Sequence, residues 1–325
     1  MTVSAPLKIL IIGGGGFIGT RLCRTLMKAG HEVRILDKKP RPMESGIVSD
    51  YVVGDVRSLE DLRKAMAGRD LVYNLAAEHR DNVIPLSLYT AVNVIGARNI
   101  CAVATEAGVK HMIFTSSVAV YGAQSKPMKE DAEHAFFNEY GRTKHLAEAE
   151  YQAWLEASSS NRLTVIRPTV VFGPGNCGNV YNFLRQIKHG PFLMFGEGAN
   201  IKSMAFVDNI GAFLAFLALK PERYGVYNYA DKPDFTVREL VRVVDQTLGR
   251  PERERVSFPV PMAVLTGHIA DFLSFMLGRP LPISSVRVKK FCAPSEIDAE
   301  KAFATGFVPP VDMAEGLKAM VLDHV

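Results

Sequence analysis

The chain has 325 residues, of which 48% are hydrophobic and 22% charged, a balance typical of a soluble globular protein. Lys and Arg number 38 against 34 Asp and Glu, and the resulting formal net charge of +4 is too small to indicate a nucleic-acid partner. Four cysteines, Cys23, Cys101, Cys177 and Cys292, lie far apart, without a CxxC pair or a histidine at ligand spacing. We therefore expect reduced thiols in a cytoplasmic protein, with no disulfide framework and no metal site.

Short apolar runs alternate with segments of helical periodicity through the first half of the chain. Because each predicted strand is apolar on both faces, we expect a parallel sheet covered by helices on both sides, which is a doubly wound α/β fold. The predicted strands are 7–12, 33–36, 51–53, 71–75, 112–115 and 163–166, and the predicted helices are 17–29, 59–66, 87–107 and 140–157.

A glycine-rich turn, 13–19, joins the first predicted strand to its helix. Gly13, Gly16 and Gly19 allow a tight turn and a close approach of the backbone to a pyrophosphate, which the helix N-terminus then attracts. Phe17 and Ile18 complete the turn. A glycine-rich turn without a ligand is the alternative, but a turn placed between strand and helix favours a dinucleotide site.

The carboxyl ends of the next strands supply further candidate contacts for a dinucleotide. Asp37 follows the glycines by about 20 residues, where a carboxylate accepts hydrogen bonds from ribose hydroxyls and repels a 2′-phosphate. NAD is therefore the expected cofactor, although Lys38 and Lys39 keep NADP open. We expect the dinucleotide also to contact Asp55, Val56, Leu75, Ala76 and Ala77.

A candidate catalytic group consists of Ser117, Tyr140 and Lys144. Ser117 ends a predicted strand at the sheet edge where doubly wound folds bind ligands. Tyr140 and Lys144 are four residues apart and so share one helix face, where an ammonium lowers the pKa of a phenol and makes it usable as a base. Tyr-x-x-x-Lys alone is a common surface pair, but the glycine turn and the serine favour catalysis.

In order and spacing, these motifs resemble the extended short-chain dehydrogenases/reductases, namely the NAD-dependent epimerase/dehydratase group that acts on nucleotide sugars. The resemblance implies a Rossmann-type NAD-binding domain over 1–172 and a substrate-binding region over 173–325, of which about 204–230 returns to the sheet. It also places Asn93 in a catalytic tetrad, with a helix-bending polar residue as the alternative. The segments that carry it are 13–19, Asp37, 54–55, 75–77, 116–122, Tyr140 with Lys144, 167–175, 206–209 and 306–317.

Two departures from the family pattern narrow the expected reaction. Val118 and Ala119 stand where 4,6-dehydratases carry an Asp-Glu pair, which argues against 4,6-dehydration. Val170 replaces an asparagine that is usual in galactose-type epimerases, which leaves two reactions open. We expect a 4-epimerase of a UDP-hexose or UDP-N-acetylhexosamine slightly ahead of a 4-keto reductase, and a non-catalytic dinucleotide sensor is a remote third reading.

The resemblance also suggests contacts for the substrate. Lys202 and Arg287 occupy basic positions suited to a sugar diphosphate, although each alone is also an ordinary surface cation. His79 follows the fourth strand at the same sheet edge and is a further candidate, with an unremarkable loop residue as the alternative.

The helices 87–107 and 140–157 carry apolar residues on more than one face. One face packs on the sheet, and the remainder is available to a second subunit, so we expect a homodimer joined through a four-helix bundle. The apolar residues concerned are Val92, Ile95, Ile100, Val103, Leu146, Tyr151 and Trp154.

The apolar stretch 256–277 is interrupted by prolines, Gly267 and Asp271, so we do not expect a membrane-spanning helix. Within it, 261–277 forms an amphipathic pattern that fits either a lid or membrane contact, or a helix docked on protein. Because its polar face offers only His268 and Asp271, we expect the docked helix. Its apolar face consists of Leu265, Ile269, Phe272, Leu273 and Met276.

Overall fold

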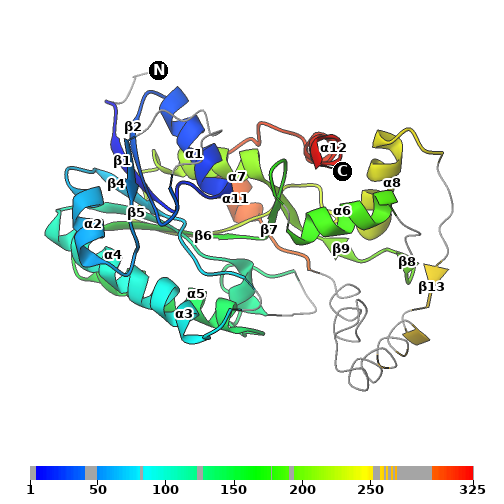
Figure 1. Ribbon diagram of the computed structural model, residues 1–325, viewed down its shortest axis with the longest axis horizontal. Helices are drawn as coiled ribbons and strands as arrows, with labels where there is room; N and C mark the ends of the chain where they lie inside the picture. The colour runs from blue at the N-terminus through cyan, green and yellow to red at the C-terminus, as the bar shows by residue number, and fades with distance from the viewer. Residues whose placement is uncertain are drawn as a thin grey trace.

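A computed structural model describes residues 5–40, 50–80, 83–122, 127–176, 178–189, 194–251, 257–259, 261–262, 265, 268 and 295–324. Its centre is a seven-stranded sheet in the order β11-β6-β5-β4-β1-β2-β3 (Figure 1), and every strand pair in it is parallel. This arrangement confirms the doubly wound α/β fold. The strands are β1 (Lys8–Ile12), β2 (Glu32–Asp37), β3 (Asp50–Val53), β4 (Leu71–Asn74), β5 (His111–Thr115), β6 (Arg162–Pro168) and β11 (Tyr224–Tyr229).

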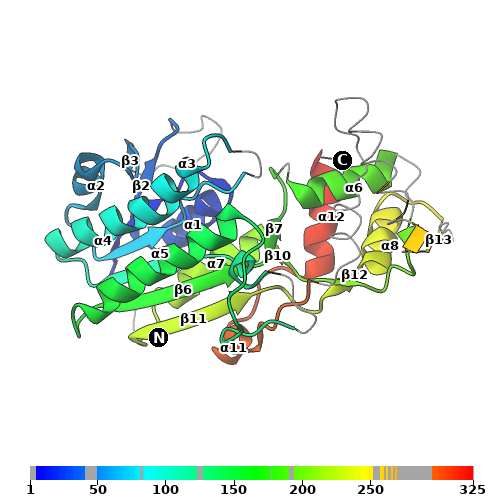
Figure 2. The same ribbon diagram turned by 90° about the horizontal axis from the view of Figure 1, so that it is seen from below.

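Helices cover both faces of this sheet, each over its own hydrophobic core (Figures 1 and 2). On one face α1 (Phe17–Lys28) packs against α7 (Val207–Leu217). On the other face α4 (Gly96–Glu106) packs between α2 (Leu59–Met66) and α5 (Glu139–Glu156). Strands buried on both faces explain the near-continuous apolar runs of the sequence.

The single helix expected over 87–107 is divided into three segments. These are α3 (Ser87–Tyr89), the π-helical turn η1 (Thr90–Ile95) and α4. The Asn93 side chain is bonded to the backbone of Glu78, while a Cβ on Gly96 would lie 2.8 Å from the Val56 side chain. We attribute the wide turn to these two attachments, because periodicity carries no information about such tertiary contacts.

The C-terminal region has a hydrophobic core of its own. Strand β7 (Val170–Phe172) pairs in parallel with β10 (Met204–Phe206), and α6 (Asn179–His189), α8 (Val237–Thr247) and α12 (Met313–His324) contribute apolar side chains to the same core. After β10 the chain runs through α7 and rejoins the large sheet as β11. The remaining short elements are η2 (Val118–Tyr121), β8 (Met194–Phe195), β9 (Ile201–Lys202), β12 (Phe235–Thr236), β13 (Ser257–Phe258) and α11 (Glu300–Ala304).

Of the amphipathic segment 261–277, four residues are described, and Pro261, Met262, Leu265 and His268 are all helical. Leu265 was expected on the buried face, but its exposed fraction is 61%, so that expectation is wrong at this residue. An apolar stripe predicts a helix, yet it does not specify which surface covers the stripe. The other residues of the stripe lie outside the described residues. Among the described helices, none is both long and apolar enough to cross a membrane.

Helix α5 buries a lysine against the sheet. Lys144 is 1% exposed, its Nζ donates a hydrogen bond of 2.5 Å to the carbonyl oxygen of Thr115, and the ammonium lies 4.3 Å from the centroid of the Phe114 ring. Loss of hydration disfavours the charged form and lowers the pKa of Lys144 to about 7. The carboxyl end of β5 therefore holds a lysine that titrates near neutral pH.

This burial predicts a pH dependence of stability. Between pH 7 and the ordinary lysine pKa, the unfolded chain binds a proton at Lys144 that the folded chain releases, so the free energy of unfolding rises with pH. From pH 7 to pH 9 the contribution is about 2 to 3 kcal/mol. Lys144→Met removes this contribution, and chemical denaturation of both proteins at several pH values measures it. Equal slopes of stability against pH would contradict the predicted pKa.

Candidate active site

A cavity of about 830 Å³ opens at the carboxyl ends of the central strands. Both the glycine-rich turn and the segment that carries Ser117 line it. Nearly all the predicted site residues line it, namely Gly13, Gly16, Phe17, Ile18, Gly19, Asp37, Asp55, Val56, Leu75, Ala76, Ala77, His79, Ser117, Tyr140 and Lys144. The fold thus brings into one cavity residues that are spread over more than a hundred positions of the chain.

The glycine-rich turn lies in direct backbone contact with the end of β4. Gly13 has a φ of +78°, and a Cβ there would lie 2.7 Å from the backbone nitrogen of Ala76. A Cβ on Gly19 would lie 2.6 Å from the carbonyl oxygen of Gly13. No larger residue fits either position, and the N-terminus of α1 consequently opens onto the cavity.

Two carboxylates lie beside this turn. Asp37 accepts hydrogen bonds from the backbone nitrogens of Gly15 at 3.0 Å and Lys39 at 3.1 Å. Asp55 forms an ion pair of 2.7 Å with Arg57, whose guanidinium holds the pKa of the Asp55 carboxyl below its usual value. The donor groups of the turn, the helix N-terminus and an acceptor at the end of β2 together fit a bound NAD.

Ser117 and Tyr140 are brought together by the close packing of α5 on the turn η2. Asn138 caps α5 by accepting a hydrogen bond from the backbone nitrogen of Gly141, where a Cβ would lie 2.4 Å from the carbonyl oxygen of Ala119. Burial raises the pKa of the Tyr140 phenol, and a hydrogen bond with the Ser117 side chain acts in the opposite direction. The side chains of Ser117 and Tyr140 are therefore direct neighbours.

The expectation that Lys144 lowers the pKa of Tyr140 does not hold for the protein alone. The pKa of Tyr140 is raised, because desolvation of the phenol is the largest effect on it. The Lys144 ammonium is turned to the Thr115 carbonyl and is itself partly neutral near pH 7. Spacing along a helix shows that two side chains share a face, but it does not show how far each is desolvated.

The other predicted residues occupy less central places. Asn93 exchanges hydrogen bonds with the backbone of Glu78, donates one of 3.0 Å to the Thr143 hydroxyl, and does not line the cavity. His79 is exposed where it borders the cavity. Lys202 belongs to the short strand β9 and is absent from the described lining. Arg287 lies outside the described residues.

Several lining residues were not singled out from the sequence as site residues. Glu78 is buried and pairs with Arg80 at 2.9 Å, an ion pair that lowers the pKa of Glu78 to about 2. Phe137 and Val170 also line the cavity, although they are 66% and 41% exposed. The sequence marks Val170 only as a departure from the family pattern, and no spacing marks Phe137, which packing between distant segments brings to the cavity.

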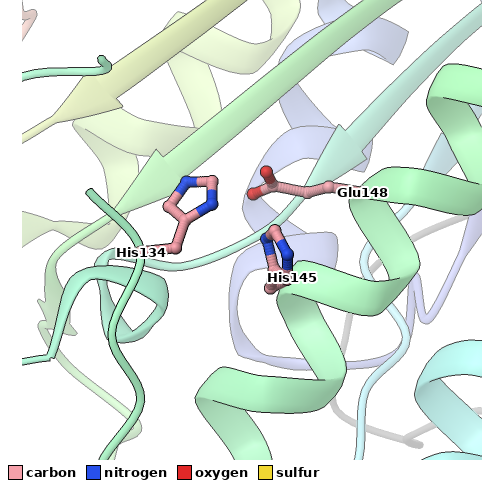
Figure 3. Close-up of side chains that lie close together, drawn as sticks. All are labelled: His134, His145 and Glu148. Carbon is pink, nitrogen blue, oxygen red and sulfur yellow. The ribbon is translucent and has the colours of Figure 1, made fainter. Parts of the chain in front are cut away.

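Three potential metal ligands lie close together, His145 and Glu148 on α5 and His134 in the segment before this helix (Figure 3). The Glu148 carboxylate already accepts two hydrogen bonds, of 2.9 and 2.6 Å, from the guanidinium of Arg167. This ion pair is largely buried, and Arg167 also donates to the hydroxyl of Tyr121 at 2.7 Å. We therefore interpret the group as part of an ion-pair network that joins α5, β6 and η2.

Comparison with known proteins agrees with this geometry. The family model described as "NAD dependent epimerase/dehydratase family" matches residues 9–230. An N-acetyl-alpha-D-glucosaminyl-diphospho-ditrans,octacis-undecaprenol 4-epimerase of Escherichia coli O157:H7 is 46% identical over 312 residues, 95% of this chain and 93% of that protein. A 2-alkyl-3-oxoalkanoate reductase of Stenotrophomonas maltophilia is 30% identical, over 97% of this chain and 98% of the reductase.

Among solved structures, the UDP-glucose 4-epimerase of Thermus thermophilus in complex with NAD superposes with a TM-score of 0.73 at 21% identity, covering 98% of this chain and 99% of that one. The 4-epimerase relative is much more similar than the reductase, so epimerisation is favoured over the keto reduction that the sequence left open. The chain is an enzyme with NAD as its cofactor, and it belongs to the NAD-dependent epimerase/dehydratase family.

Proposed function

We propose that the protein inverts C4 of a hexose or N-acetylhexosamine carried on a diphosphate. The observation that carries the proposal is the placement of Ser117, Tyr140 and Lys144 in the cavity that also holds the glycine-rich turn. A UDP-sugar is the substrate class expected from the sequence, and a polyprenol diphosphate sugar is the substrate named for the Escherichia coli relative. Both present a C1 diphosphate and a free C4 hydroxyl to the enzyme.

In this proposal each residue of the catalytic group has a separate task. Tyr140 takes the proton of the C4 hydroxyl and later returns it, and Ser117 holds the C4 oxygen by a hydrogen bond. Lys144 in its protonated form stabilises the Tyr140 phenolate. NAD, when bound, supplies the reversible hydride acceptor that oxidation and reduction at C4 require. Asn93 acts at a distance, by holding the backbone of Glu78 beside the cavity.

In the same proposal the dinucleotide is held by the glycine-rich turn, by Asp37 and by the ends of β3 and β4. Asp37 accepts from the adenosine ribose, and Asp55 and Val56 border the adenine. Leu75, Ala76 and Ala77 let the dinucleotide cross the sheet edge. His79 is assigned to the substrate, together with Lys202 and Arg287 as contacts of the diphosphate.

The proposal includes a homodimer in the cytoplasm. Ile95 is 43% exposed and Leu146 half-buried, whereas Ile100, Val103, Tyr151 and Trp154 are buried within the subunit. In an interface through the helices 87–107 and 140–157, Ile95, Leu146 and their polar neighbours therefore make the contacts. Cys23 and Cys101 are buried and form no disulfide, which suits a reducing compartment.

The direct test of the function is turnover without added reductant. The purified protein, its bound dinucleotide identified after release, is expected to interconvert the C4 epimers of UDP-N-acetylglucosamine or of the matching polyprenol diphosphate sugar with no NAD(P)H supplied. Tyr140→Phe is expected to lose most turnover and to retain the dinucleotide. Turnover only with NADPH and a keto sugar would contradict the proposal, and undiminished activity of Tyr140→Phe would remove the assigned base.

Cofactor choice is tested at Asp37. Asp37→Ala loses a charge-assisted hydrogen bond to the ribose, which weakens NAD binding by about 1.5 to 3 kcal/mol, roughly 10- to 150-fold in dissociation constant. Binding of NADP is expected to weaken much less, or to improve, because Lys38 and Lys39 remain. Asp37→Asn is the matched control, since its amide oxygen still accepts from the Gly15 nitrogen. Unchanged NAD affinity in Asp37→Ala would show that this carboxylate does not bind the ribose.

The assembly is tested by mass. Light scattering at micromolar concentration is expected to give twice the chain mass of 35.7 kDa, because an isologous interface would pair Ile95 and Leu146 with the same surface of a second copy. Ile95→Glu places a charge in that interface and is expected to shift the population to monomers. A monomeric wild-type protein would overturn the proposed homodimer.

A further inference from the structure

Four large apolar side chains that line the cavity, or lie within four residues of its lining along the chain, are exposed to solvent. They form the apolar rim, which we define as Ile84, Leu86, Phe137 and Val170, with exposed fractions of 92%, 61%, 66% and 41%. Phe137 and Val170 also line the cavity. Isolated exposed apolar residues are ordinary, but several at one opening are typical of a surface that binds an apolar ligand.

Three separate segments of the chain present the rim. Ile84 and Leu86 lie just before α3, whose Leu88 lines the cavity. Helix α3 packs against α5, and Phe137, two residues before α5 begins, lines the same cavity as Leu88. Val170 begins β7, which belongs to the C-terminal core. A substrate group that extends from the cavity past these segments contacts the apolar side chains of the rim.

Two polar side chains of the connection between β4 and α3 precede Ile84 and Leu86 along the chain. His79 and Arg80 line the cavity, and the Tyr89 hydroxyl donates a hydrogen bond to the carbonyl oxygen of Arg80, which ties this connection to α3. The Arg80 side chain is 69% exposed while it pairs with Glu78. The cavity lining thus includes the imidazole of His79 and the guanidinium of Arg80, which lie on the same connection as Ile84 and Leu86.

We propose that the apolar rim binds the isoprenoid chain of a polyprenol diphosphate sugar. This inference rests on the proposed function, because it places the sugar at the catalytic group and adds His79 and Arg80 to the contacts of the diphosphate. A nucleoside requires hydrogen-bond partners for its ribose and base, whereas an isoprenoid chain requires apolar area alone, as this rim offers. The substrate named for the relative that is 46% identical carries such a chain.

The test compares substrates that differ only in the length of the chain. N-Acetylglucosamine diphosphates that carry one, two or four isoprene units are supplied below their micelle concentration, in the absence of vesicles, alongside UDP-N-acetylglucosamine. The wild-type enzyme is expected to show a KM that falls at least about tenfold from one unit to four. The double variant Ile84→Ser/Leu86→Ser is expected to lose most of that dependence, with a similar kcat on the one-unit substrate.

A matched control is Leu219→Ser, since Leu219 is 59% exposed and lies after α7, outside the described lining of the cavity. It should keep the dependence on chain length. Thermal melting and retained NAD show that each variant is folded.

The outcomes separate the two proposals. Absence of epimerisation with every substrate would overturn the proposed function itself. Epimerisation with a KM that is independent of chain length would contradict binding of the isoprenoid chain by the apolar rim. A dependence on chain length that the double variant retains would contradict it as well. In both cases the proposed function would stand. A chain-length effect that arises only when lipid vesicles are added would assign the rim to membrane acyl chains and would likewise overturn the inference.

Discussion

The close approach of two backbones at the end of the sheet is the constraint on which the rest of the site depends. The turn after β1 lies against the start of the segment after β4, so closely that a single Cβ at Gly13 would lie 2.7 Å from the Ala76 nitrogen. Because neither backbone can move outwards without breaking the parallel pairing of β1 with β4, the donors of the turn hold one fixed position. Asp37, at the end of the adjacent strand, is bonded to the same turn and therefore shares that position.

A second constraint relates the catalytic side chains to this fixed edge. Helix α5 approaches η2 closely at Gly141, and Lys144 is bonded to the last residue of β5. The buried pair of Arg167 and Glu148 joins α5 to β6, and the Tyr121 hydroxyl extends the network to η2. Removing one partner of such a pair leaves an uncompensated buried charge, so the network fixes the arrangement more than it adds stability. Tyr140 is thereby held on a helix that is attached at three points along its length.

The apolar rim and the catalytic group differ in the kind of chain segment that carries them. Tyr140 and Lys144 lie on α5 and Ser117 caps η2, whereas Ile84, Leu86 and Phe137 lie on connections outside the helices and strands. Connections of this kind vary in length and composition without disturbing the strands beneath them. A family that acts on one kind of diphosphate sugar can therefore change the group it accepts on the far side of the diphosphate while the chemistry at C4 stays the same.

The amino-acid sequence by itself determined the parallel sheet, the glycine-rich turn, Asp37 and the spacing of Tyr140 and Lys144, because these depend on local periodicity and on residues whose backbone requirements are specific. Only the tertiary structure decided the π-helical turn at Asn93, the upward shift in the pKa of Tyr140, the exposure of Leu265 and the collection of apolar side chains at the opening. Each of these depends on whether a side chain packs against a distant segment of the fold or stays exposed. Desolvation and packing between distant segments follow from those contacts, and no local pattern of residues encodes them.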